Sequence, residues 1–121
     1  MIWHLKDNGV RRPKDLPDHI ERRLCFALSR FGSRIGKVFV FLHDMNGPKG
    51  GIDKVCRILV KTEGFGIVVV AVADTEWVAA VDRATTRVGH SVARQLAKWR
   101  ERHAARSARK PVERLWARGR A

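Results

Sequence analysis

The fold is decided by residues 74–103, DTEWVAAVDRATTRVGHSVARQLAKWRERH, whose apolar side chains recur at intervals of three and four. This spacing puts them on one stripe of a helix, which is the pattern of a helix lying on a core. The stripe consists of Trp77, Val81, Ala84, Val88, Val92, Leu96 and Trp99. Asp74 or Thr75 can cap the first turn. The sequence therefore predicts one long helix over residues 74–103.

A second series of residues on this predicted helix is basic. It has the same spacing but is turned about 200° from the apolar stripe, because each residue rotates a helix by about 100°. The series is Arg83, Arg87, His90, Arg94, Lys98 and Arg102. One face of the helix is thus predicted to be buried and another cationic. A charged helix face can also do no more than keep the helix solvated.

The composition of the whole chain favours a polyanionic partner. The 121 residues include 25 Lys and Arg against 12 Asp and Glu, which gives a formal net charge of +13. Nucleic acid is the leading candidate for that partner. A membrane surface is disfavoured, because the sequence has no apolar run approaching about 18 residues and residues 1–8 lack the apolar centre of a signal peptide. We expect a cytoplasmic protein.

Upstream of residue 74, the sequence predicts a first helix and the strands of a sheet. The helix runs from Asp18 to Gly32 and has an apolar side that includes Ile20 and Leu24. Alternation and β-branched content predict strands over residues 1–5, 37–43, 54–62 and 65–73. The order strand, helix, three strands, helix predicts an α+β two-layer sandwich, with a four-stranded sheet and two roughly parallel helices on one face.

The domain organisation follows from length and composition. A chain of this length with 45% hydrophobic residues supports one core. We expect a single domain over residues 1–103. The Arg-rich segment over residues 104–121 is predicted to be a basic, flexible tail.

The first helix repeats the arrangement of the last one. Its arginines lie off the apolar side, and they are Arg22, Arg23, Arg30 and Arg34. Helices side by side on a sheet would merge their arginines into one broad basic surface. On this first helix we expect Phe26 to pack against the neighbouring helix, with stacking on a nucleic-acid base as the alternative.

The sheet face away from the helices is predicted to be apolar. It would present Phe39, Phe41, Leu59, Ile67 and Val69. Such a face is unusual in water, so it is a candidate surface for a homodimer or another protein. Packing beneath the N-terminal segment or the tail is the alternative.

An enzymatic site is difficult to assemble from this sequence. His43 and Asp44 at a strand end, with Cys56 alongside, form a nucleophile and base without an orienting third group. Both Cys25 and Cys56 are predicted to be reduced, buried residues. The glycine-rich loop over residues 44–53 lacks the Gly-Lys-Ser/Thr ending of a nucleotide-binding loop. We expect no enzyme, no metal and no cofactor.

Four segments together resemble the hibernation-promoting, ribosome-associated inhibitor family, also called the sigma-54 modulation family, in its short form. They are IERRLCFALSRFGSRI (20–35), VFVFLHD (38–44), NGPKGGIDKVCRILV (46–60) and ADTEWVAAVDRATTRVGHSVARQLAKWRER (73–102). The most specific parts are AVDRA, RQLAKWRER and GGIDKVC. The resemblance covers roughly residues 20–103.

The resemblance implies a β-α-β-β-β-α fold similar to a double-stranded-RNA-binding domain. It also implies binding to the small ribosomal subunit and its rRNA, and the silencing of translation in dormancy. The basic positions of that family fall here on Arg23, Arg87 and Arg94, whereas the other basic candidates come from the helix faces alone. The second domain of long members is absent, so pairing of ribosomes by that route is not expected. A general structured-RNA-binding protein remains an alternative.

Overall fold

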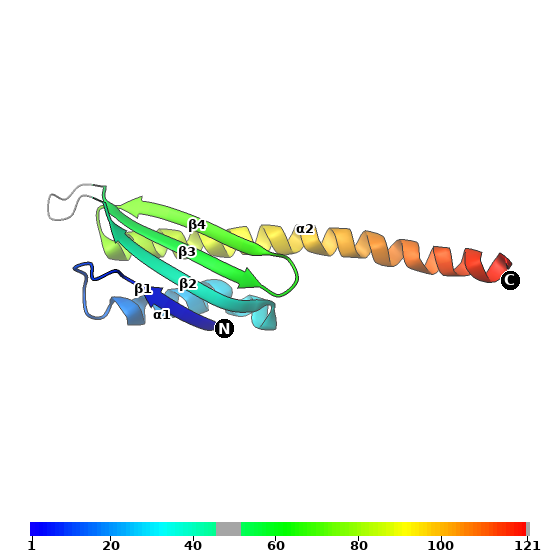
Figure 1. The fold of residues 1–121 in the computed structure, drawn as a ribbon, viewed down its shortest axis with the longest axis horizontal. Helices are drawn as coiled ribbons and strands as arrows, with labels where there is room; N and C mark the ends of the chain where they lie inside the picture. Colours follow the sequence, from blue (N-terminus) through cyan, green and yellow to red (C-terminus); the bar gives the residue numbers. More distant parts are fainter. Residues whose placement is uncertain (46–51, 121) are drawn as a thin grey trace.

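The computed structural model describes residues 1–45 and 52–120, with side chains described up to Ala104. A four-stranded sheet is covered on one face by two helices (Figure 1). The elements in chain order are β1 (Ile2–Lys6), α1 (Leu16–Leu28), the 3₁₀ helix η1 (Ser29–Arg34), β2 (Ile35–Asp44), β3 (Lys54–Thr62), β4 (Ile67–Asp74) and α2 (Trp77–Arg120). The predicted α+β two-layer sandwich is confirmed.

The strands lie in the order β1-β2-β3-β4. β1 pairs with β2 in parallel, because α1 crosses over the sheet between them, whereas the hairpins β2-β3 and β3-β4 are antiparallel. Burial alternates along each strand: Val38, Val40 and Leu42 of β2 are fully buried, while the residues between them are partly exposed. The sheet therefore has one face on the core and one face open.

Both helices bury the stripes that their sequence periodicity predicts. On α2 the residues from Trp77 to Leu96 in the apolar series are buried, and Trp99 is half-buried. On α1 the buried residues are Leu16, Ile20, Leu24 and Leu28. Together with the inner face of the sheet they form one continuous core. At about 1.5 to 3 kcal/mol for each buried Val, Leu or Ile, this packing is the main source of stability.

The first helix ends earlier than residue 32. α1 stops at Leu28, and the chain tightens into η1 before entering β2. Within η1, Gly32 has φ 57° and ψ −132°, a conformation that glycine adopts without strain. The helical conformation is therefore interrupted at Gly32, the residue predicted to end the helix, although the residues just before it are 3₁₀ rather than α-helical.

The last helix continues beyond residue 103, to Arg120, and runs past the end of the sheet (Figure 1). The flexible tail over residues 104–121 stays a prediction. The predicted loop over residues 44–53 is closed at its base by the amide of Met45, which donates to the carbonyl of Asp53 at 2.9 Å. Its central residues, 46–51, lie outside the described part of the chain.

α1 and α2 lie close together at Gly89. A Cβ atom at this buried position would lie 3.2 Å from the carbonyl oxygen of Ala27 and 3.4 Å from its Cβ. Glycine inside a helix costs about 1 kcal/mol relative to alanine. Here that cost is offset because the absent side chain lets the two helices pack close together.

Replacing Gly89 by valine is expected to lower stability by roughly 1 to 3 kcal/mol, because its methyl groups force the helices apart. Thermal unfolding followed by circular dichroism measures this as a drop in Tm of about 5 to 15 °C. The matched control is Ala97→Val at an exposed position of the same helix, which should cost only about 0.5 kcal/mol of helix propensity. Equal Tm values for the two variants would contradict the close approach.

Candidate nucleic-acid interface

The seam between α1 and α2 gathers several of the predicted basic residues. The two helices run side by side in the same direction (Figure 1). Two adjoining hollows lie along the seam and share Arg30, and a third hollow, lined by α2 alone, adjoins them through Thr86 and His90. The cationic side chains that line them are Arg23, Arg30, Arg83, Arg87, Arg94 and Arg100. The seam is thus a shallow groove with a basic lining.

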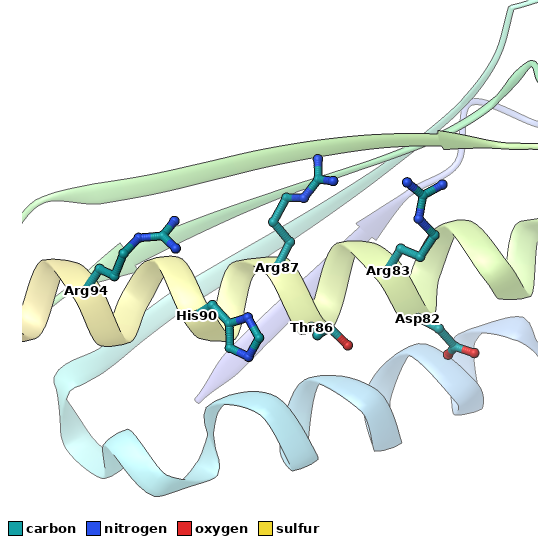
Figure 2. A pocket seen from close by; sticks show the side chains of 6 residues that line it. All are labelled: Asp82, Arg83, Thr86, Arg87, His90 and Arg94. Carbon is teal, nitrogen blue, oxygen red and sulfur yellow. The ribbon is translucent and has the colours of Figure 1, made fainter.

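Two rows of side chains leave α2 in different directions (Figure 2). Asp82, Thr86 and His90 point toward α1, whereas Arg83, Arg87 and Arg94 lie on the side turned away from α1. The second row contains the arginines predicted from the helix periodicity. The first row, apart from His90, was not predicted.

Asp82 joins the two helices electrostatically. Its carboxylate oxygen Oδ1 lies 2.6 Å from Nε2 of His19 and 3.3 Å from Nε of Arg23, both on α1. Arg23 also donates to the hydroxyl of Thr86 at 3.1 Å and to that of Thr85 at 3.4 Å. Arg23 therefore spans the seam, and its guanidinium is largely occupied by α2.

Other predicted cations are also held by neighbouring groups. Arg83 donates to Oδ2 of Asp74 at 3.1 Å, and the guanidinium carbon of Arg34 lies 4.9 Å from the ring centre of Trp99. Arg30 is placed in the same way over Phe31, at 4.8 Å. These contacts fix the direction of each guanidinium while leaving much of its surface exposed.

The remaining predicted cations face solvent. Arg22, Arg87, Lys98 and Arg102 are exposed and make no hydrogen bond or ion pair among the side chains that the structure describes. Arg94 is exposed and donates only to the hydroxyl of Ser91, at 3.1 Å. Arg87 and Arg94 thus line the hollow on α2, beside the seam, with free donors. Arg22, Arg34, Lys98 and Arg102 lie outside the lining of the three hollows.

Phe26 does not pack against the neighbouring helix, contrary to the prediction. It is 79% exposed, although it lines the central hollow, and the guanidinium carbon of Arg23 lies 5.7 Å from its ring centre. The close contact at Gly89 leaves no room for a phenyl ring between the helices. The ring therefore stands at the rim of the groove.

The cysteine and histidine arrangement considered from the sequence is not formed. Cys56 faces the core, where burial raises the pKa of its thiol to about 12, whereas His43 is exposed on the open sheet face. The two side chains are therefore on opposite sides of the sheet. Cys25 is exposed on α1, so the prediction that it is buried is wrong. Its position, one residue after Leu24, turns it about 100° away from the apolar stripe.

Solved structures that share this architecture include the following two. The N-terminal domain of Protein Y from Thermus thermophilus matches with a TM-score of 0.62 at 23% sequence identity, over 78% of this chain and 98% of that chain. This chain has the fold of that domain. A ribosomal subunit interface protein from Coxiella burnetii matches with a TM-score of 0.65 at 16% identity, over 80% of this chain and 99% of that chain.

No family model matches the chain, and no curated protein matches it. Over the described residues, no helix is both long and apolar enough to cross a membrane.

The pairing of Arg23 with Asp82 should make a small contribution to stability. Both side chains are about a third to two-fifths exposed, so solvent screening limits the coupling to about 0.5 kcal/mol. A double-mutant cycle with Arg23→Gln and Asp82→Asn, measured by urea unfolding, isolates this term. Purely additive effects of the two substitutions would show that the contact does not link the helices energetically.

The start of α2 should be sensitive to acid through Asp74. The hydrogen bond from Arg83, and then the backbone amide of Thr75, hold the pKa of Asp74 below its usual value of 3.8. A lowered folded-state pKa means that the charged carboxylate stabilises the fold above about pH 4, and that this stability is lost as the pH falls through the folded pKa. The Tm advantage of the native chain over Asp74→Asn should therefore be constant near neutrality and shrink below pH 3.8. An advantage that did not vary with pH would refute the role of the charge.

Proposed function

We propose that this chain is a member of the hibernation-promoting family that binds rRNA of the small ribosomal subunit and blocks translation in dormancy or stress. It would act in the cytoplasm, through the basic face of its two helices. The observation that carries the proposal is the basic surface of the two helices, in which Arg87 and Arg94 present exposed guanidinium groups in a hollow on α2 that adjoins the α1-α2 seam.

The charge of the groove supports an RNA partner. A net charge of +13 exceeds what solubility requires, and a row of arginines follows the outer side of α2. Arginine suits phosphate because its planar fork binds two oxygens at once. Contacts of this kind follow the shape of the RNA backbone more than its base sequence.

The structural neighbours support the ribosome as the source of that RNA. One of them is described as a ribosomal subunit interface protein, and its match covers nearly its whole length. The described residues of the four sequence segments that resemble the hibernation-promoting family lie mainly on α1, η1, β2, β3 and α2. The likeness of fold and the resemblance of sequence thus point to the same class of protein.

The proposed action requires no reaction at a bond. A protein that occupies the surface where other RNA molecules would bind competes with them by exclusion, and its affinity alone sets the effect. If about six to eight cations each neutralise a phosphate, the affinity should fall steeply with salt, with a slope of about −0.7 to −0.9 per contact.

Reversing the charge of Arg87 and Arg94 tests the proposal. The Arg87→Glu/Arg94→Glu variant should lose its saturable binding to the small subunit, measured by co-sedimentation on sucrose gradients at about 0.1 M and about 0.5 M salt. The native protein should saturate near one copy per subunit. Loss of two contacts should also reduce the salt slope by about 1.5.

A matched control reverses two exposed cations outside the helix seam. Arg11 and Lys14, in the segment between β1 and α1, are both exposed, so Arg11→Glu/Lys14→Glu makes the same change in net charge. This control should retain most of the binding. Equal losses in both variants, or unsaturable binding to both subunits, would reduce the helix face to general affinity for polyanions and favour a general structured-RNA-binding protein.

A further inference from the structure

The open face of the sheet carries cations as well as the predicted apolar side chains. The outward-facing positions of the four strands include exposed basic and imidazole groups at Lys6, Lys37, Arg57, Lys61, His4 and His43. Over these described strands, no Asp or Glu alternates to this face. The face is therefore positively charged as well as apolar.

Two aromatic rings lie at the centre of this face. Phe39 and Phe41 are two residues apart on the central strand β2, which places their Cα atoms roughly 6.6 Å apart on the same side of the sheet. The register puts His4 and Leu59 on either side of Phe39 and places Arg57 beside Phe41. Both rings are half-buried, so their outer surfaces remain accessible.

Charged and planar groups already lie against these rings. The ring of His4 stacks on Phe39 with centroids 5.3 Å apart and 21° between the planes. The ammonium of Lys61 lies 5.4 Å from the centre of Phe39, and the guanidinium carbon of Arg57 lies 5.8 Å from the centre of Phe41. The two phenylalanine rings thus make stacking contacts with a flat group and cation-π contacts with positively charged groups.

A second copy of this chain fits the face poorly. Two copies facing each other would bring two positively charged faces together, each carrying Lys37, Arg57 and Lys61, and like charges brought together out of water repel strongly. The cations also sit over the apolar rings that such an interface would need to bury. The predicted homodimer surface is therefore disfavoured by charge.

Unpaired nucleotides combine the two properties that this face selects. A base has a flat surface that stacks on an aromatic ring, and the adjoining phosphate attracts Lys and Arg. In a duplex the bases are stacked on each other and cannot reach the rings. A face with rings at its centre and flexible cations beside them therefore discriminates in favour of single strands.

We propose that the open sheet face binds single-stranded RNA, with two unpaired bases stacking on Phe39 and Phe41. Arg57 and Lys61 swing from the rings to the phosphates of the same nucleotides, because their long side chains are exposed and can turn outward. This site lies on the opposite side of the sheet from the helices. It is independent of the helix groove, and either site can fail without the other.

The Phe39→Leu/Phe41→Leu variant tests the site without changing the charge. Fluorescence anisotropy with a labelled eight-nucleotide RNA of A and C, which cannot pair with itself, should show affinity weakened about tenfold. The same strand annealed to its complement should bind both proteins within about twofold. An unchanged affinity for the single strand, or an equal loss on the duplex, would overturn the proposal.

A second pair of variants keeps the test decisive if the leucine protein unfolds. Arg57→Gln/Lys61→Gln removes two exposed cations from the sheet face, and Arg11→Gln/Lys14→Gln removes two exposed cations elsewhere. The Arg57→Gln/Lys61→Gln variant should lose about tenfold more affinity for the single strand than the Arg11→Gln/Lys14→Gln variant. Only Arg57 and Lys61 are proposed to contact phosphates beside a stacked base. Equal losses would overturn the site.

Two further measurements separate the alternatives. In an Arg87→Glu/Arg94→Glu background the leucine substitutions should still weaken single-strand binding by about tenfold, which distinguishes failure of this site from failure of the helix groove. Sedimentation equilibrium of the native protein should give a monomer. A dimer that the leucine substitutions dissociate would make a second copy the occupant and refute RNA binding at this face.

Discussion

The contact of α1 with α2 at Gly89 is the constraint on which the arrangement of the molecule depends. Because Gly89 has no side chain, the backbone of Ala27 can lie directly against α2. The close fit lets Leu24 and Val88 be fully buried over the same sheet face. It also brings Arg23 and Arg30 beside Thr86 and His90 of α2, next to the row of arginines on that helix. The spacing of the cations is therefore set by packing in the core rather than by any attraction among the charges.

Packing can impose this arrangement because the energies are unequal. Each buried Val or Leu contributes about 1.5 to 3 kcal/mol, whereas two exposed like charges about 8 Å apart repel by roughly 0.5 to 2 kcal/mol, less in salt. Asp82 relieves part of that repulsion, because its carboxylate on α2 lies 3.3 Å from Nε of Arg23 on α1. The helices thus stay together despite their charge, and the outer arginines remain available.

The periodicity of residue types along a single helix predicts which side chains are buried and which are exposed, and these predictions are confirmed for α2. The buried series from Trp77 to Leu96 and the exposed arginines Arg87 and Arg94 follow from helical spacing alone. The partnership of Asp82 with His19 could not be predicted, because the two residues are 63 positions apart and meet only when the helices pack.

The errors have a related physical origin. Phe26 was expected between the helices, but the space that it would fill is closed by the contact at Gly89, a distance that no single-helix pattern encodes. The open sheet face carries the predicted apolar residues, but the cations that lie across the register from Phe39 and Phe41 become apparent only when the strands are paired. Whether the proposed site residues bind RNA depends on a partner that the fold does not contain.

The thin, two-layered form of the molecule allows both of its broad faces to contact a binding partner. A sheet and one layer of helices amount to a slab about 20 Å thick. Both broad faces carry positive charge, and they carry few carboxylates that would repel a polyanion. A slab of this kind suits a crevice with RNA on both walls better than one flat surface, because attachment to the first wall raises the effective concentration at the second. The protein would then dissociate only when both faces had separated from the RNA at the same time. Its residence time would be much longer than binding through either face alone could give.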